Sequence, residues 1–210
     1  MGARVVGLLF GLGLFGFAIV LIYESKLGLS PWDVLNQGVS NHTPLSFGVA
    51  NICISLLVLL LGWALGGRPG WGTLANAVLV GATIQGLTSI DAVTDLAHEP
   101  LGVRIVLLLA GVALIGPATA FYIGADFGAG PRDTLMLVGA RRTGQRVGLV
   151  RAVLELCALG CGIALGGNFG VGTIVFALAV GPVIEAAFWL LERSPLAASV
   201  PAAAPVIVGE

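Results

Sequence analysis

The sequence repeats itself at an offset of one hundred residues. Aligning residues 2–84 with residues 102–184 without a gap gives 29 identical pairs out of 83. Within this alignment Gly28-Leu-Ser-Pro-Trp-Asp33 falls on Gly128-Ala-Gly-Pro-Arg-Asp133. The agreement exceeds what a composition rich in Gly, Ala, Val and Leu gives by accident. The chain is therefore a tandem duplication, which is one recognised plan for a membrane transporter.

Composition assigns the duplicated chain to the membrane. Hydrophobic residues form 57% of the sequence and charged residues 10%, whereas an ordinary soluble domain has roughly 25% charged residues. Six stretches have the length of about 20 apolar residues that a transmembrane helix needs. They lie near residues 5–23, 47–66, 71–90, 103–123, 147–166 and 171–191. The sequence predicts an all-α membrane protein with the lipid bilayer as its partner, and its net charge of −1 does not suggest nucleic acid.

Each copy of the repeat supplies three of the six predicted spans. We expect a first repeat over residues 1–95, a second over 96–194, and a disordered cytoplasmic tail over 195–210, which is rich in Ala and Pro. Because the number of spans per copy is odd, the second copy enters the membrane from the opposite side. The two three-helix repeats are thus expected to be inverted, related by a pseudo-two-fold axis in the membrane plane.

Basic residues indicate the orientation, since cytoplasmic loops carry an excess of Lys and Arg. A cytoplasmic N-terminus places seven basic residues inside and two outside. Those inside are Arg4, Arg68, Arg132, Arg141, Arg142, Arg146 and Arg193, and those outside are Lys26 and Arg104. Both termini are therefore expected in the cytoplasm.

A short extra helix is predicted after the first span of each copy. In the first copy Ser30 is a good N-cap, Pro31 suits the first helical position, and Asp33 suits the third, with Trp32 between them. The second copy has Gly130-Pro131-Arg132-Asp133 instead. One interpretation is a re-entrant half-helix whose N-terminus faces an anionic substrate. The other is an interfacial helix lying flat, with Trp32 at one membrane surface and Arg132 at the other.

Glycines recur between the second and third spans of each copy. Gly66-Gly67-x-x-Gly70-x-Gly72-Thr73 has the same pattern at residues 166–173. The pattern loosely resembles a phosphate-binding loop, but it lacks the terminal Lys-Ser/Thr and a preceding strand. A tight turn that uses positive φ at glycine is the better interpretation. Small residues four apart, such as Gly7 with Gly11, are expected to let helices pack closely.

Ionisable residues inside spans are costly in a membrane and are therefore the best functional candidates. Arg151 and Glu155 lie four residues apart on one face of the fifth span and can pair. Glu185 lies at a similar depth on the sixth span. The repeat aligns these residues with uncharged polar ones in the first half, and Asn76 is a further polar candidate. The aligned residues are Asn51, Ser55 and Gln85.

Two interpretations of these residues stay open. In the functional one, Glu155 or Glu185 is a proton or cation site, and Arg151 sets the charge state of its neighbour or meets an anion. In the structural one, Arg151 and Glu155 form a pair near the interface, while Glu185 extends toward the headgroups. Gln85, Asn51 and Ser55 would line the corresponding half of the pathway only in the functional case.

Catalytic, metal and cofactor sites are not expected. Both histidines lie in predicted loops, and the sequence has no Gly-x-Ser-x-Gly or His-Glu-x-x-His motif. Cys53, Cys157 and Cys161 lie in apolar runs without further ligands nearby and are interpreted as buried thiols. We expect a protein that is not an enzyme.

Three motifs together resemble those of a known family. They are Gly28-Leu-Ser-Pro-Trp-Asp-Val-Leu-x-x-Gly38, Ser46-Phe-Gly48, and Gly70-x-Gly72-Thr73-x-x-Asn76. The chain is similar to the YczE branch of the YczE/YyaS/YitT integral membrane proteins over nearly its whole length short of the tail. This resemblance implies a bacterial plasma-membrane (inner-membrane) protein, with links to secondary-metabolite production in some members. It implies neither a substrate nor catalytic residues.

Two functions follow as hypotheses. The first is a transporter or permease for a small molecule or ion, suggested by the inverted repeat and the charges inside the spans. The alternative is a non-transporting membrane scaffold or accessory factor that supports another system, such as secondary-metabolite production. Small-residue faces would permit a homodimer, but they would equally serve packing within one chain.

Overall fold

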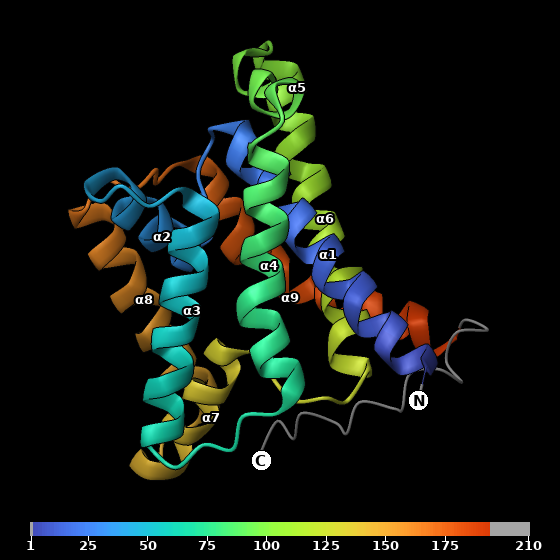
Figure 1. Cartoon of the computed structure of the whole chain (residues 1–210), viewed down its shortest axis with the longest axis vertical. Coiled ribbons are helices and arrows are strands. Elements are labelled where there is room, and N and C mark those ends of the chain that lie inside the picture. The colour runs from blue at the N-terminus through green and yellow to red at the C-terminus, as the bar shows by residue number, and fades with distance from the viewer. Residues whose placement is uncertain (1, 194–210) are drawn as a thin grey trace.

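The chain folds as a set of helices whose order repeats (Figure 1). The computed structural model describes residues 2–193, and the predicted disordered tail at 195–210 lies outside this range. In the described part every regular element is helical. The elements are α1 (Gly2–Ser25), α2 (Pro31–His42), α3 (Phe47–Ala64), α4 (Trp71–Thr88), α5 (Asp91–Thr94), the 3₁₀ helix η1 (Asp95–His98), α6 (Leu101–Gly124), α7 (Pro131–Thr143), α8 (Val147–Ala164) and α9 (Val171–Glu192).

Five of these helices, α1, α3, α6, α8 and α9, are each long and apolar enough to cross a membrane. The third predicted span, α4, is long and apolar enough to cross a membrane only when α5 and η1 are counted with it. These two elements continue α4 after a bend of 90°. The polar residues Asn76 and Gln85 lower the hydropathy of α4. The observed helices begin and end within about one turn of the predicted spans, but α5 and η1 were too short to leave a periodic pattern in the sequence.

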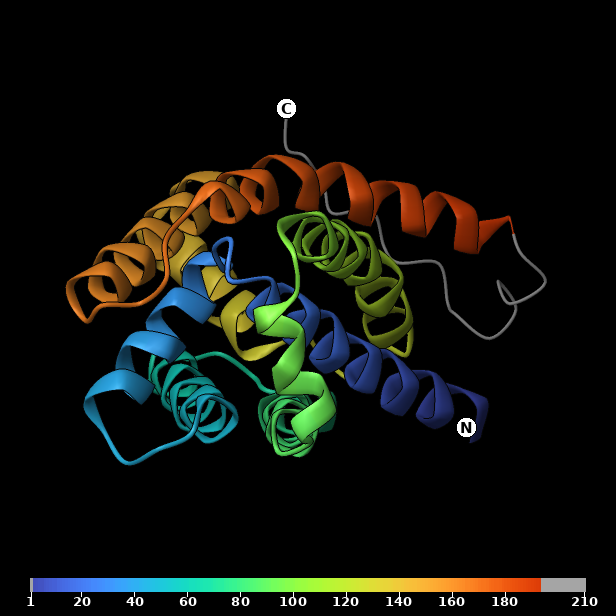
Figure 2. The same cartoon turned by 90° about the horizontal axis from the view of Figure 1, so that it is seen from above.

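The centre of the molecule is the pair formed by α1 and α6, which have the most extensive contact of any two helices (Figure 2). Glycine makes this contact close, because a Cβ atom at Gly11 would lie 2.7 Å from the backbone nitrogen of Tyr122. A Cβ atom at Gly111 would likewise lie 2.8 Å from the carbonyl oxygen of Ala18. Around this pair α4 packs on α1 and α9 packs on α6. The buried core includes Leu12, Ile19, Val20, Ile84, Leu108, Val112 and Ile115.

The two halves of the chain interlock. The short helix α2 packs on α8 of the other half, and α7 packs on α3. Two arginines at equivalent positions bridge the halves at both ends of the central pair. Arg104 Nε donates to the carbonyl oxygen of Ser25 at 2.7 Å, and Arg4 Nε donates to that of Ala125 at 3.0 Å.

The repeated glycine motif takes part in this interlocking. The turn prediction is confirmed at Gly66 and Gly166, whose φ angles are +92° and +69°. The later glycines have a second role that the sequence did not reveal, which is contact between halves. Gly72 N donates to the carbonyl oxygen of Phe127 at 2.8 Å, and Gly172 N donates to that of Leu27 at 2.7 Å.

The surface of the helices is apolar, and this corrects one prediction. Cys53, Cys157 and Cys161 are exposed on α3 and α8 and are not buried thiols. The prediction was wrong because an apolar run does not distinguish a face packed against protein from a face that a lipid bilayer covers. Neither kind of face needs polar side chains.

Candidate functional site

The first turn of α2 holds a buried carboxylate. Ser30 caps the helix as predicted, because its Oγ accepts a hydrogen bond from Asp33 N at 3.3 Å. The Asp33 side chain also contacts Ser30 Oγ, and its Oδ1 accepts a hydrogen bond from Asn36 Nδ2 at 3.1 Å. Ser30 and Asp33 are each 4% exposed. Since α2 begins in the interior, its free N-terminal end and this carboxylate lie away from the surface.

The first turn of α7 holds a second carboxylate in a different setting. Tyr122 Oη donates a hydrogen bond to Asp133 Oδ2 at 3.1 Å. A Cβ atom at Gly130 would lie 3.3 Å from that Oδ2, 3.4 Å from Tyr122 Oη and 3.7 Å from Asn76 Cγ. The three side chains therefore converge on the start of α7, which brings the candidate Asn76 of α4 next to Asp133.

The two first turns meet. Arg132 Nη2 lies 3.7 Å from Asp33 Oδ1, and the guanidinium carbon lies 5.2 Å from the centre of the Trp32 ring. The interpretation that placed Trp32 and Arg132 at opposite surfaces is therefore wrong. It treated each short helix by its own sequence, whereas in the folded chain Arg132 of α7 lies against Trp32 and Asp33 of α2.

From this meeting point the two short helices run to different hairpins. Near the end of α2, Asn41 Nδ2 donates to the carbonyl oxygen of Gly166, in the turn between α8 and α9, at 2.9 Å. Near the end of α7, Arg142 Nε donates to the carbonyl oxygen of Leu65, in the turn between α3 and α4, at 2.7 Å. Figure 1 shows the α8–α9 turn at the upper left, near α2, and the α3–α4 turn at the lower end of the molecule. The two short helices thus approach one shared interior region from different sides.

We define the α2–α7 site as the polar residues gathered at this meeting point. Its charged groups are two carboxylates and one guanidinium, and the two helix N-termini add partial positive charge. The Arg132 side chain is 29% exposed and Asp133 is also partly exposed, whereas Asp33 is buried. Such a set can bind a small polar molecule or ion through both signs of charge. The members are Ser30, Trp32, Asp33, Asn36, Asn76, Tyr122, Arg132 and Asp133.

The charged residues predicted inside the later spans are not gathered in the same way. Arg151 Nε and Glu155 Oε1 form the predicted ion pair at 2.9 Å, with side chains 50% and 35% exposed. Glu185 is exposed on α9, and within residues 2–193 it has no ion pair or hydrogen bond through its carboxylate. The structure therefore separates Glu185 from the pair on α8.

Their counterparts in the first half lie in a packed region. Asn51 and Ser55 are 2% and 6% exposed on α3. Gln85 on α4 accepts a hydrogen bond from Ser46 Oγ at the start of α3 through Oε1. Gln85 thus links α4 to the start of α3, whereas Asn51 and Ser55 are buried in the packing of α3.

Two members of the site were missed in the sequence. Asn36 lies one turn beyond Asp33, so its i,i+3 spacing was a usable signal. Tyr122 carries a hydroxyl in an apolar run, and a buried tyrosine hydroxyl usually finds a partner. The partner Asp133 lies on another helix, so that partnership was not readable from spacing.

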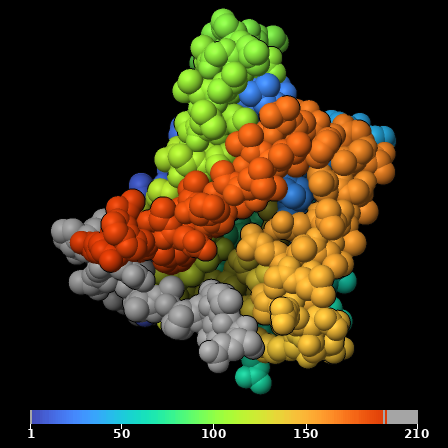
Figure 3. All heavy atoms as spheres, turned by 180° about the vertical axis from the view of Figure 1, so that it is seen from behind, coloured from blue at the N-terminus to red at the C-terminus, as the bar shows by residue number. Residues whose placement is uncertain are grey.

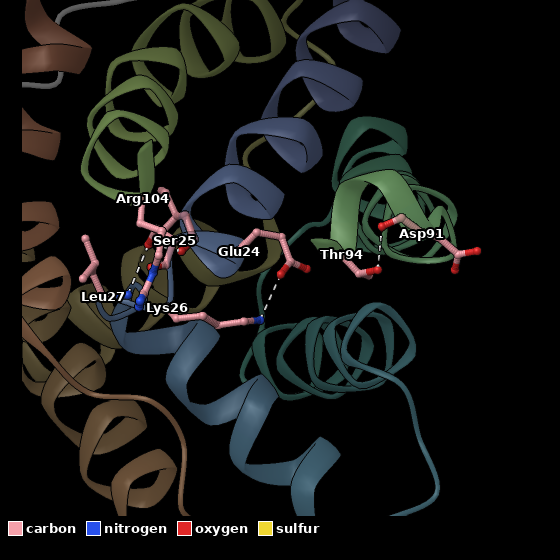
Figure 4. Close-up of polar contacts among 8 residues, drawn as sticks. Glu24, Ser25, Lys26, Leu27, Asp91, Thr94 and Arg104 are labelled. Atoms are coloured by element: carbon pink, nitrogen blue, oxygen red, sulfur yellow. Dashed lines mark hydrogen bonds and ion pairs between the residues drawn. The ribbon is translucent and has the colours of Figure 1, made fainter. Parts of the chain in front are cut away.

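A further buried carboxylate, Glu24, was also missed (Figure 4). Its side chain is 2% exposed, and Lys26 Nζ lies 3.0 Å from its Oε2. Its other oxygen, Oε1, is buried without a hydrogen-bond partner among the described residues. Figure 4 also shows Arg104 reaching the backbone of Ser25 next to this pair. This cluster lies at the end of α1.

Within residues 2–193 there is no group of three or more His, Cys, Asp or Glu side chains that could hold a metal ion. The acids of the α2–α7 site have arginine, serine, asparagine and tyrosine as neighbours instead.

The apolar helices around an interior polar site define a multi-pass α-helical membrane protein. The chain belongs to the family of unknown function DUF6198, which matches residues 2–188. An uncharacterized protein of Haemophilus influenzae is 36% identical over 190 residues, covering 90% of this chain and 84% of its own. The uncharacterized membrane protein YczE of Bacillus subtilis is 34% identical over 179 residues, covering 83% and 80%.

A second protein of Bacillus subtilis, the uncharacterized protein YyaS, is also similar. It is 26% identical over 184 residues, covering 87% of this chain and 91% of its own. The resemblance to the YczE group is thereby confirmed. No solved structure matches the chain.

Proposed function

We propose that the protein is a transporter for a small molecule or ion in the bacterial inner membrane, and that the α2–α7 site is its central binding site. The observation that carries this proposal is the contact between the first turns of two short helices, through Asp33 and Arg132 at 3.7 Å. Secondary transporters commonly bind substrate where discontinuous helices end inside the membrane. Interior polar groups are costly in a membrane and are retained where they have a function.

The repeat supports the same proposal. We infer that the two halves are inverted repeats, with both termini in the cytoplasm, as the basic residues indicate. In that arrangement α2 enters the site from outside and α7 enters from the cytoplasm. The paired bonds of Arg4 and Arg104 across the halves agree with such an axis. A site at the axis can be reached from either side when the halves exchange conformations.

The first test uses access of water to the site. In a background without native cysteines, Arg132→Cys is introduced and treated with a membrane-impermeant thiol reagent, applied separately to each side of proteoliposomes. We expect modification from at least one side, because Arg132 is partly exposed inside the molecule. Complete protection from both sides would favour the scaffold alternative over a transport pathway.

The second test measures flux. Proteoliposomes are screened for uptake of radiolabelled amino acids, sugars and inorganic ions, and any positive solute is tested with Asp33→Asn. Hydrogen bonds to charged groups contribute about 1.5–3 kcal/mol, so we expect flux at limiting solute to fall at least about tenfold. Asp126→Asn is the matched control, because Asp126 forms an exposed ion pair with Arg4. Equal flux in both variants would show that Asp33 does not take part in binding the solute.

A further inference from the structure

The first half of the chain contains a closed pair of helices, α3 and α4. A Cβ atom at Gly48 would lie 2.7 Å from the carbonyl oxygen of Gly81, and a Cβ atom at Gly81 would lie 2.7 Å from that of Gly48. The backbones therefore touch at these two glycines. One turn away, Ser46 Oγ and Gln85 Oε1 join the same two helices by a hydrogen bond.

The second half has the same two glycines but not the contact. Gly148 and Gly181 align with Gly48 and Gly81, yet a Cβ atom at either position would meet nothing within 4 Å among residues 2–193. The helices α3 and α4 pack along each other, whereas α8 and α9 are not among the packed helix pairs. Figure 3 shows the resulting hollow between α9 and the pair α7 and α8. The molecule is therefore closed in one half and open in the equivalent place of the other.

The residues that flank the glycines also correspond. Arg146 aligns with Ser46, and Glu185 aligns with Gln85. Both are exposed on the separated helices α8 and α9. Where the first half has a hydroxyl and an amide that meet, the second half has a cation and an anion that could meet.

We propose a second conformation in which α8 and α9 close as α3 and α4 are closed here. In it Gly148 packs against Gly181, and Arg146 forms an ion pair with Glu185. At the same time α3 and α4 separate at Gly48 and Gly81. This proposal rests on the proposed transport function, for which it supplies the two gates of the α2–α7 site.

The charges of the open half are consistent with such a closure. Closing α8 onto α9 would bury groups that correspond to Asn51 and Ser55, which are buried on α3. Arg151 and Glu155 already form a pair on one helix and would move together as a neutral unit. The Arg146–Glu185 pair would neutralise the remaining acid. Without that pair, closure would leave Glu185 unpaired in a position that is partly buried, as that of Gln85 is in the closed half, which is unfavourable.

Disulfide trapping in liposomes tests the proposal. In a background with Cys53→Ala, Cys157→Ala and Cys161→Ala, one variant carries Arg146→Cys with Glu185→Cys, and another carries Ser46→Cys with Gln85→Cys. We expect each pair to cross-link in a fraction of the molecules. The control pair is Val153→Cys with Glu185→Cys, because residue 153 aligns with Cys53, which faces outward in the closed half. The control should not cross-link.

A four-cysteine variant tests the exchange directly. Cross-linking the 46–85 pair first should lower cross-linking of the 146–185 pair at least about tenfold, which corresponds to about 1.4 kcal/mol. The proposal is overturned if the 46–85 pair cross-links to completion while the 146–185 pair never forms. It is also overturned if both pairs form together in one molecule.

Steric variants provide an independent measurement. Gly148→Leu adds a side chain where this conformation has open space, so expression and thermal stability should stay unchanged while 146–185 cross-linking disappears. Gly160→Leu is the matched control on α8, since Gly160 also has open space and aligns with the exposed Leu60. If Gly148→Leu leaves cross-linking intact, Gly148 does not take part in closure.

These measurements separate the conformational proposal from the transport proposal. Cross-linking requires no substrate, so reciprocal trapping without flux of any tested solute would keep the closure and reject transport of those solutes. If flux depends on Asp33 but no 146–185 cross-link forms, the transport proposal stands and the proposed closure of α8 onto α9 is rejected.

Discussion

Replacing Gly11 by alanine should loosen the central pair of helices. An alanine Cβ at this position would lie 2.7 Å from Tyr122 N and 2.9 Å from Ala118 O, both backbone atoms that cannot rotate away. Relieving the shorter contact to an ordinary 3.4 Å requires a shift of about 0.7 Å between α1 and α6. Overpacking of this kind lowers the free energy of unfolding by about 1–3 kcal/mol.

The same helix offers a control two residues away. A Cβ atom at Gly13 would meet nothing within 4 Å in the part of the chain that the structure describes. Gly13→Ala therefore carries the gain in helix propensity of about 1 kcal/mol without the clash. Because both variants share that gain, the difference between them isolates the contact of Gly11 with α6.

Thermal unfolding of the detergent-solubilised protein measures this difference. For a chain of this size each kcal/mol changes Tm by about 2–4 °C, so Gly11→Ala should unfold about 2–12 °C below Gly13→Ala. The reasoning is refuted if the two variants have equal Tm, because the close approach of α1 and α6 would then not exist in solution.

Two further predictions concern charged residues outside the α2–α7 site. Lys26→Met should lower the free energy of unfolding by about 1–3 kcal/mol, because it leaves the buried Glu24 carboxylate without its cation. Adding Glu24→Gln should restore part of the loss, and chemical denaturation of both variants checks this; a further loss in the double variant would contradict it. Glu155→Gln should change stability by less than about 0.5 kcal/mol, because its pair with Arg151 is exposed. A larger decrease in the same assay would show that this pair is buried in the membrane-embedded protein.

Local patterns in the sequence predicted the helices well. The start of α2 depends on neighbouring residues, since Ser30 caps the helix, Pro31 occupies its first position and Asp33 its third. The apolar runs likewise predicted the long helices, because each run alone must satisfy its backbone hydrogen bonds in a membrane. These features involve residues within a few positions of one another.

The candidate site was only partly predictable. Asp33 and Arg132 were singled out as parts of separate helix starts, but their contact joins residues about one hundred positions apart. Glu185 was grouped by depth with Arg151 and Glu155, yet α9 carries it away from α8. Depth along a helix axis follows from residue number, whereas the distance between two helices depends on how all the helices pack.

By itself the sequence determined that this is a duplicated, helical membrane protein with equivalent elements in its two halves. Only the tertiary structure decided that the short helices meet at one interior polar site, and that the two equivalent hairpins differ. The glycines Gly48 and Gly81 and their counterparts Gly148 and Gly181 have the same local sequence signal. One pair is in contact and the other is not, because a glycine permits a close approach of helices but the packing of the whole chain decides whether the approach occurs.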